Sequence, residues 1–407
     1  MTGFVKVGFV VLLLLMLCQF ILLNRYKIFN KNKLAKVPES REYFNLQDNM
    51  NQIQQRRKHM RAHCSRHTRS YPNKARHQEK VYKRLLVNEQ YKFLLCPVAK
   101  IGSTFLKAVF KTLNTTERNP IRTLENSPII RKERFPILTD FNKTEQDRIL
   151  RTYTKVIFVR NPFRRLFSGY QNKFVTINYP FWSRGMRAGI IKTFRPNPSN
   201  KSLTCGHDTK FEEFLSYVIA LSEKGGVENM DIHWQPIDIE CDPCMIDYNI
   251  IGKMETFHSD MQYFLSTIGA EDRIELPRPG SSSLEHLRSR LKGEIKWAFN
   301  QLSKLKDCIS ENEYSMRIVQ NFVSHGYIEP LDATDLDDLS KIRYGPNTAE
   351  KLTKWIFNYV DKSNKTYLLN LPEETQKAAY ARLPRDLLLR AKMAYLNDLA
   401  LFSYDSP

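Results

Sequence analysis

The sequence lacks the Gly-x-x-x-x-Gly-Lys-Ser/Thr order of a Walker A loop and any aspartate cluster suited to Mg²⁺. Both absences count against a nucleotide-dependent kinase of the P-loop type. Cys241 and Cys244 form a Cys-x-x-Cys pair, but no second Cys/His pair stands at a spacing that would complete a zinc site. A thioredoxin-like context is also missing, so a structural bridge is the favoured interpretation of these cysteines. Internal repeats and long low-complexity tracts are absent as well.

Acidic residues are scarce: 43 Asp and Glu stand against 63 Lys and Arg, a net charge of +20. This imbalance favours anionic partners such as nucleic acid, a membrane surface or acidic glycans, unless it only keeps the protein soluble. It is strongest from Arg56 to Arg84, where eleven Lys and Arg and four His accompany one acidic residue, Glu79. Only Tyr71 and Tyr82 could stack on bases there, which argues against nucleic acid. A solvated, flexible stem is favoured over a stripe that concentrates an acidic glycan.

A long apolar run covers Val7 to Leu23. Its length is at the short end for a membrane helix. A cleaved signal peptide is the alternative, but Asn24-Arg25-Tyr26 after the run offers no small-x-small cleavage site, so an uncleaved anchor is favoured. Basic residues are denser after the run than before it, which alone would place the N-terminus outside. Two sets of residues beyond the run outweigh this and place the bulk of the chain in a lumen. They are the sequons at Asn114, Asn142, Asn200 and Asn364, and Cys64, Cys96, Cys205, Cys241, Cys244 and Cys308. Six such cysteines allow fifteen disulfide connectivities.

Hydrophobic periodicity predicts an α/β domain. Strands are expected at 91–96 and 155–160, each followed by a helix. Further helical patterns cover 208–223, 255–268, 284–306, 349–360 and 384–400, the last with an apolar side that packs. This alternation indicates a mainly parallel sheet, in which ligands bind beyond the carboxyl ends of the strands.

The first strand ends in a turn with Lys100, Gly102, Ser103 and Thr104, just before the helix. Unpaired N–H groups and the positive dipole end at a helix N-terminus attract a phosphate or a sulfate. Gly102 allows close backbone approach, and Lys100 adds a mobile charge. An ordinary strand-to-helix turn with a chance lysine is the alternative.

The second strand ends at Arg160, with Asn161 as a helix cap and Pro162 in the first turn. Ser168 follows about two helical turns after Arg160. An arginine fork and a serine hydroxyl can hold one phosphate from two sides. Pairing of Arg160 and Arg165 with surface carboxylates is the alternative, but basic residues opening a helix are unfavourable unless an anion is present.

Together the two turns resemble the cofactor motifs of Golgi carbohydrate sulfotransferases, in particular the chondroitin/dermatan 4-O-sulfotransferase group. The group's Pro-Lys-Val-x-x-Thr-x-Trp-Lys motif corresponds to residues 99–107, where Ala99 and Leu106 depart from it. Its Arg-x-Pro-Phe-x-Arg-Leu-x-Ser-x-Tyr motif corresponds to residues 160–170 without departure. His233-Trp234-Gln235-Pro236, the Cys-x-x-Cys pair, Gly252-Lys253-Met254-Glu255 and the C-terminal Tyr395 to Tyr404 are also similar to the group. The likeness is weakest at 176–226 and 271–350, where insertions are expected.

The resemblance implies a P-loop-NTPase-like sulfotransferase fold with an N-terminal membrane anchor. The expected parts are a cytoplasmic tail (1–6), a transmembrane signal-anchor (7–23), a basic lumenal stem (24–88) and a catalytic domain (89–407). The expected place is the Golgi membrane, single-pass and type II, with a glycan or proteoglycan acceptor and no nucleic acid. The implied donor is 3′-phosphoadenosine 5′-phosphosulfate, and no metal is expected if cationic side chains carry the charge.

The expected donor site has two ends. Lys100, Ile101, Gly102, Ser103 and Thr104 would hold the 5′-phosphosulfate, with Lys100 stabilising the leaving phosphate. Three residues, Arg160, Arg165 and Ser168, would serve the 3′-phosphate end.

His233 is the first candidate for the general base, because an imidazole titrates near neutrality, and Glu255 is the second. A hydrogen bond beside Trp234 and a salt bridge with Lys253 are their respective structural alternatives. Lys107, Lys173 and Arg165 could line an anionic acceptor groove or merely face solvent.

The favoured reaction is sulfonyl transfer to the 4-position of N-acetylgalactosamine in chondroitin-type chains. Another glycan acceptor, or a glycan-binding relative without catalysis, is the alternative that Ala99 and Leu106 leave open.

Overall fold

A computed structural model describes residues 46–67, 71–115, 133–176, 185–276, 284–342, 345 and 347–406. The expected tail, the expected anchor and the first part of the expected stem lie outside these residues. Among the helices that are described, none is long and apolar enough to cross a membrane.

Four short strands form one sheet in the order β1 (Leu86–Asn88), β2 (Phe93–Cys96), β3 (Thr154–Val159) and β4 (Ile250–Lys253). β1 is antiparallel to β2, whereas β2, β3 and β4 run parallel. Cys96 lies opposite Ile157, and Val159 lies opposite Lys253, so the three parallel strands end along one edge. The prediction of a mainly parallel sheet is confirmed, as are both predicted strands.

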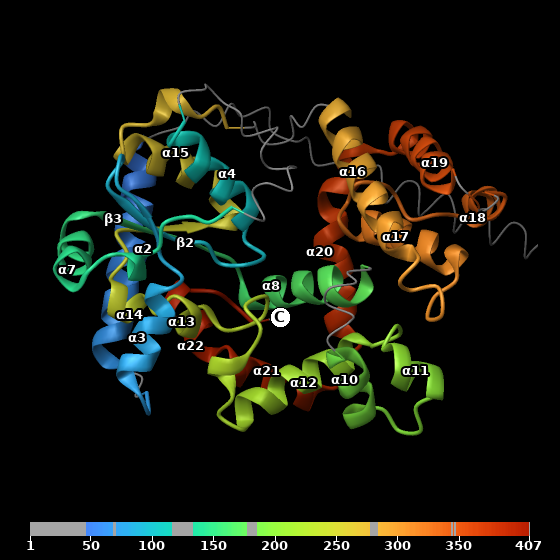
Figure 1. Cartoon of the computed structure of the whole chain (residues 1–407), viewed down its shortest axis with the longest axis horizontal. Helices are drawn as coiled ribbons and strands as arrows, with labels where there is room; N and C mark the ends of the chain where they lie inside the picture. Colours follow the sequence, from blue (N-terminus) through green and yellow to red (C-terminus); the bar gives the residue numbers. More distant parts are fainter. Residues whose placement is uncertain are drawn as a thin grey trace, which may run out of the picture. The chain divides into compact units, whose positions relative to one another are not determined.

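Helices cover both faces of the sheet (Figure 1). Phe93 of β2 makes edge contacts with Phe110 of α4 (Ser103–Leu113) and Phe264 of α15 (Phe257–Thr267), so these two helices lie on one face. Side chains alternate along a strand, and Cys96 therefore points to the other face. There it is joined to Cys241, which ends the short helix α13 (Ile237–Glu240).

The part of the expected stem that the structure describes is instead folded. Residues 46–88 form α2 (Leu46–Arg66), α3 (Lys74–Tyr82) and β1, and the compact unit begins at Leu46. Ile53 and Met60 of α2 are buried in the same core as the sheet. Arg56 donates a hydrogen bond to the carbonyl of Ile251 at 3.1 Å, so α2 covers the β4 edge. The folded unit thus includes residues 46–88, on the N-terminal side of the expected boundary at residue 89.

A second core, rich in aromatic side chains, lies among α8, α12 and the C-terminal helices, and a third lies within α16–α19. The remaining α-helices are α7 (Lys143–Thr152), α8 (Pro162–Tyr170), α10 (Met186–Phe194), α11 (Asn200–Cys205), α12 (Phe211–Glu223), α14 (Pro243–Ile246), α16 (Leu284–Leu302), α17 (Glu311–Ser324), α18 (Ala333–Ser340), α19 (Thr348–Lys362), α20 (Lys365–Ala381), α21 (Arg385–Ala394) and α22 (Leu396–Phe402). The helix expected at 384–400 is thus divided at Tyr395, and its five expected packing residues, Leu387, Ala391, Tyr395, Leu399 and Phe402, are all buried.

Three disulfides use the six cysteines that follow the apolar run. They join Cys64 to Cys244, Cys96 to Cys241, and Cys205 to Cys308. The two cysteines of the Cys-x-x-Cys pair therefore bond to distant partners rather than to each other or to a metal. The structural role expected for them is confirmed.

Candidate active site

Three candidate residues follow the carboxyl ends of the three parallel strands. Lys100 comes after β2, Arg160 directly follows β3, and Glu255 comes after β4. Because these strands end in register, the three residues meet at one edge of the sheet.

The first turn presents backbone donors at the start of α4. Gly102 takes a left-handed conformation with φ 68°, and no side chain caps the helix. Ser103 and Thr104 are half-buried, whereas Ile101 is fully buried and offers only its backbone to a ligand. Lys100 also has a positive φ of 68°, which is unusual for a residue with a β-carbon and typical of functional turns. These N–H groups and hydroxyls can hold an anion.

The second turn has the geometry expected from the sequence. The Asn161 side chain accepts hydrogen bonds from the backbone N–H groups of Phe163 and Arg164, and Pro162 opens α8. Ser168 lies half-buried further along the same helix. After Tyr170, the chain continues as a π-helix, η2 (Gln171–Val175), which carries Lys173.

The two turns are in direct contact, and the side chains of Lys100 and Arg160 have no ion pair within the described residues. Arg160 Nη1 donates to the backbone carbonyl of Lys100 at 3.3 Å. Neither side chain forms a salt bridge with any carboxylate in the described part of the chain. Burial is the main cause that lowers the pKa of Arg160. Buried cations are unfavourable without a counter-charge. An anionic ligand would supply this counter-charge, so the electrostatics of the site favour its binding.

Lys100 is the most strongly perturbed of these cations. Burial, together with the positive charges of Lys173 and Arg160, lowers the pKa of its ammonium to about 7. Glu294 opposes this shift, and Arg290 reinforces it. Both of the latter residues belong to α16, which therefore contributes to the electrostatics of the site. A bound anion would favour the charged ammonium.

His233 forms a dyad with Asp231. Its Nδ1 lies 2.5 Å from Asp231 Oδ1, and the same oxygen accepts the backbone N–H of His233 at 3.0 Å. Because a carboxylate accepts only, Nδ1 carries a proton and Nε2 holds the lone pair. Burial is the main cause that lowers the pKa of His233, aided by the charges of Lys173 and Lys100. The neutral imidazole thus lies in the electrostatic surroundings of Lys100.

Glu255 lies on the other side of the site. It is exposed and accepts a hydrogen bond from the Tyr404 hydroxyl at 2.8 Å. The charge of Glu255 acts on Arg160, whereas the charge of Lys100 acts on His233. The two candidate bases therefore border opposite ends of the two-turn site.

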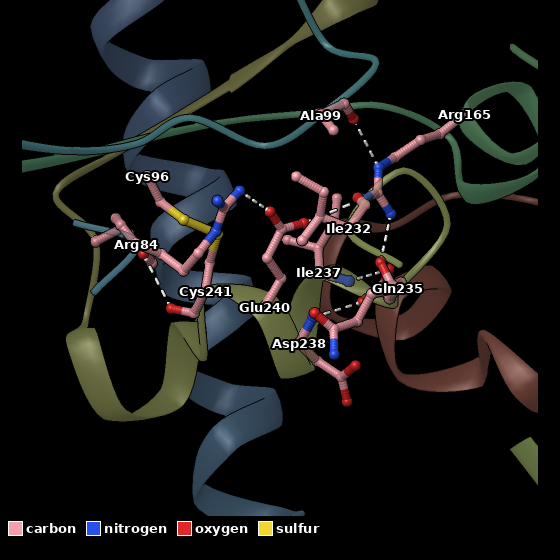
Figure 2. Close-up of a disulfide and its surroundings, with 12 residues drawn as sticks. Arg84, Cys96, Ala99, Arg165, Ile232, Gln235, Ile237, Asp238, Glu240 and Cys241 are labelled. Atoms are coloured by element: carbon pink, nitrogen blue, oxygen red, sulfur yellow. Dashed lines mark hydrogen bonds and ion pairs between the residues drawn. A yellow bond between two sulfur atoms is a disulfide. The ribbon is translucent and has the colours of Figure 1, made fainter. Parts of the chain in front are cut away.

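Arg165 lies behind the site rather than in it. Its side chain is 1% exposed. It donates to the carbonyls of Ala99, Ile232 and Gln235 and to the Glu240 carboxylate, at 2.6–3.1 Å (Figure 2). It thereby ties the first turn to the chain on both sides of His233. This geometry gives Arg165 a positioning role and leaves it little capacity for direct contact with a ligand or an acceptor.

Glu240 sits between two arginines. Its carboxylate, which is not exposed, accepts from Arg165 and also pairs with Arg84, as Figure 2 shows beside the Cys96–Cys241 disulfide. Two other lysines were expected in an acceptor groove. The charge of Lys173 acts on Lys100, whereas Lys107 has Arg84 as its charged neighbour. Within the described ranges, no group of His, Cys, Asp and Glu side chains could hold a metal ion.

Comparison with known proteins identifies the family. A family model described as "Sulfotransferase family" matches residues 83–325, a range that contains both turns and His233. The chain belongs to this family. Its small sheet flanked by helices is consistent with a sulfotransferase fold. No solved structure matches the chain.

Several curated relatives are carbohydrate sulfotransferases. Carbohydrate sulfotransferase 9 of Homo sapiens is 32% identical over 249 residues, which cover 60% of this chain and 52% of the relative. Carbohydrate sulfotransferase 8 of Mus musculus is 30% identical over 286 residues, or 69% of this chain and 65% of the relative. Carbohydrate sulfotransferase 14 of Danio rerio is 33% identical over 196 residues, or 47% and 50%. The matches thus span about half to two thirds of the length of these relatives.

Sequence reasoning missed Asp231 and His325. Asp231 could have been noticed, because it stands two residues before His233 and can reach its imidazole. His325 gave no local signal; it has Lys100 and Arg160 among its electrostatic neighbours, and its helix α17 packs beside η2.

Proposed function

We propose that this chain transfers a sulfonyl group from 3′-phosphoadenosine 5′-phosphosulfate to a hydroxyl of a glycan. The observation that carries the proposal is the pair of half-buried cationic residues, Lys100 and Arg160. The Arg160 guanidinium donates to the Lys100 backbone carbonyl, and neither side chain has an ion pair among the described residues. A donor with a phosphosulfate at one end and a phosphate at the other supplies the missing negative charge. Family membership and the names of the relatives support the same chemistry.

The donor would lie across the two turns. The backbone of Ile101 and Gly102, the hydroxyls of Ser103 and Thr104, and the Lys100 ammonium would hold the 5′-phosphosulfate. Two side chains of the second turn, Arg160 and Ser168, would hold the 3′-phosphate from two sides. Arg165 would position the first turn through the Ala99 carbonyl. This placement is in keeping with a P-loop-NTPase-like fold.

In the reaction, the acceptor oxygen forms a bond to sulfur while the bond from sulfur to the bridging phosphate oxygen breaks. Negative charge then moves onto the leaving phosphate, where the Lys100 ammonium stabilises it. The proton of the acceptor hydroxyl passes to His233 Nε2, and Asp231 holds the imidazole in the required tautomer. His233 is preferred to Glu255 because Glu255 borders Arg160, at the 3′-phosphate end.

For the acceptor we propose the 4-position of N-acetylgalactosamine in chondroitin-type chains. This finer assignment rests on the motif resemblance at residues 99–107 and 160–170. The printed names of the relatives support a carbohydrate acceptor in general terms.

We also propose that residues 7–23 anchor the chain in the Golgi membrane, with the tail cytoplasmic and the bulk lumenal. Three disulfides support an oxidising compartment. All four sequon asparagines are exposed. Loss of a glycosidase-sensitive mass shift in an Asn200→Gln or Asn364→Gln variant, with protease protection of the intact protein in sealed vesicles, would support this orientation. An unglycosylated wild-type protein open to protease would contradict it.

The test of the activity is transfer of labelled sulfate from the donor to a panel of desulfated glycans by the full-length chain. Transfer to chondroitin at the 4-position would support the whole proposal, and transfer to another glycan would correct the acceptor. Donor binding without transfer to any acceptor would favour a glycan-binding relative instead. Incorporation of phosphate from ATP would refute the proposal.

A further inference from the structure

The segment at 271–350, where the motif resemblance is weak, brings two helices to the donor site. Arg290 and Glu294 of α16 act on the charge of Lys100. His325, which caps the C-terminus of α17, has Lys100 and Arg160 among its electrostatic neighbours. α17 lies beside α16 and α20 (Figure 1). These two helices therefore border the site, and none of the proposed donor-binding residues lies on them.

The tautomer of His325 is fixed by the backbone. Its Nδ1 lies 2.7 Å from the carbonyl oxygen of Asn321, and a carbonyl only accepts, so Nδ1 carries the proton. Nε2 therefore holds a lone pair, and no hydrogen bond to a described residue uses it. The ring stacks on Tyr327 at 5.6 Å between centroids. The imidazole is thus held in place with one acceptor atom available.

The turn that carries His325 is tightly constrained. Asn321 is buried, and its side-chain oxygen accepts from the Thr176 hydroxyl at 2.9 Å, which ties α17 to the end of η2. Gly326 has φ 69°, and a β-carbon there would lie 2.4 Å from the carbonyl oxygen of Leu368. Only glycine fits this close approach. The position of His325 is therefore built into the fold.

Arg290 lies on the same side as His325. Its guanidinium stands 5.1 Å from the centre of the Tyr327 ring, on which His325 also stacks. Its Nε pairs with Glu294 at 3.3 Å, and its side chain is 43% exposed. An arginine held by an aromatic ring and a neighbouring carboxylate is pre-organised to bind an oxyanion through two N–H groups.

We propose, on the basis of the function proposed above, that His325 and Arg290 bind the glycan acceptor. His325 Nε2 accepts a hydrogen bond from a sugar hydroxyl. The Arg290 guanidinium binds a carboxylate or a sulfate on an adjacent sugar. The acceptor class is therefore an anionic glycan, and the α16–α17 segment supplies its recognition.

The protonation state agrees with this role. Burial, with the charges of Lys100, Arg290 and Arg160, lowers the pKa of His325 to about 4, against the opposing hydrogen bond to Asn321. The imidazole is therefore neutral at physiological pH, which keeps Nε2 an acceptor and adds no repulsion to a crowded cationic site. His233, paired with Asp231, remains the base.

The experiment measures KM for donor and acceptor in full-length variants that retain wild-type thermal stability and donor affinity. His325→Phe keeps the ring stack but removes Nε2, and should raise the acceptor KM about five- to tenfold with donor KM unchanged. His325→Gln should recover part of this loss, because its amide can replace Nε2. Arg290→Gln should raise the acceptor KM about tenfold, whereas Lys292→Gln, an exposed lysine on the same helix, should not.

Two substrate arms identify the anion. If Arg290 binds a carboxylate, wild type and Arg290→Gln should become equal on carboxyl-reduced chondroitin. If it binds a sulfate, the difference should appear only on a sulfated chain. An active wild-type protein with acceptor KM changed less than twofold in both His325→Phe and Arg290→Gln would overturn this inference alone. A wild-type protein without transfer to any glycan would overturn the proposed function and this inference with it.

Discussion

Arg160 donates a hydrogen bond through Nη1 to the backbone carbonyl of Lys100, across 3.3 Å. This contact joins the turn after β2 to the turn after β3, although sixty residues separate them in the chain. It brings two positive charges together where no described carboxylate pairs with either. Repulsion between them is relieved when a doubly anionic ligand bridges both turns.

The first prediction concerns these two cations. Lys100→Met is expected to lower kcat by about 10²–10³-fold or more, because it removes charge stabilisation that is strongest during transfer. Arg160→Ala is expected to raise the donor KM by about tenfold or more, because Arg160 would hold the 3′-phosphate, whose charge does not change during transfer. Lys100→Met should also raise the melting temperature of the donor-free protein, since an unpaired half-buried ammonium is lost. Activity assays and thermal melts check this. Lys143→Ala, on exposed α7, is the charge-matched control; near-wild-type kcat in Lys100→Met, or near-wild-type donor KM in Arg160→Ala, would refute the assigned site.

The second prediction follows from the pKa of about 7 for Lys100 in the donor-free protein. At pH 8 the Lys100 side chain is therefore mostly the neutral amine. Because a bound anion raises the pKa of this group, donor binding takes up a proton above pH 7. Donor affinity should therefore fall as pH rises from 7 to 9, by up to about tenfold per unit. The donor's phosphate is already fully charged in this range, with its second pKa near 6.

Calorimetry in buffers of different ionisation enthalpy measures this proton uptake. Arginine stays charged throughout the range, so Lys100→Arg should bind with a flat pH profile whatever its absolute affinity. An equally steep fall in Lys100→Arg would show that another group titrates.

A third prediction separates the two candidate bases by kcat, measured at saturating donor, and by donor KM, measured in a donor titration. His233→Ala should lower kcat by about 10²–10⁴-fold with donor KM unchanged, as expected for loss of a general base. Asp231→Asn should lower kcat less, because the imidazole remains but loses its orienting carboxylate. Glu255→Gln should change donor KM rather than kcat, since Glu255 borders Arg160. A full loss of kcat in Glu255→Gln, with His233→Ala active, would reverse the assignment.

The fourth prediction concerns stability. Glu240→Gln is expected to reduce the free energy of unfolding by about 3 kcal/mol or more, because it leaves the buried Arg165 without a counter-charge. Denaturant unfolding measures this loss. Glu79→Gln breaks an exposed pair with Lys83 and should cause no measurable change. Equal stability of the two variants would mean that Glu240 does not support the site.

The sequence predicted those parts of the fold that depend on local patterns. Both strand–turn–helix segments were found because an apolar run, a polar turn and a helix start lie within about fifteen residues of each other. Helix α2 was missed for the opposite reason. Only Asn49, Ile53 and Met60 are buried in its 21 residues. The contacts that hold it come from α14, β4, α15 and the C-terminal helix α22, all of which lie far away in the sequence.

The same distinction applies to the site. Lys100, Arg160 and His233 lie in short motifs whose residues act near one another. Arg165 matched a motif too, but only the fold reveals that its guanidinium is occupied by four protein oxygens. His325 could be recognised as a candidate only from the structure, because its hydrogen bond and its charged neighbours are not encoded in a short sequence motif.

The disulfide between Cys64 and Cys244 has a practical consequence for producing the enzyme. A recombinant fragment that starts at the sequence-derived boundary, residue 89, would lack Cys64 and leave Cys244 as an unpaired thiol open to crosslinking between molecules. It would also expose the β4 edge, which α2 covers through Arg56. Secretion of such a fragment should yield disulfide-linked aggregates, whereas one that starts before Leu46 retains both the helix and the bond.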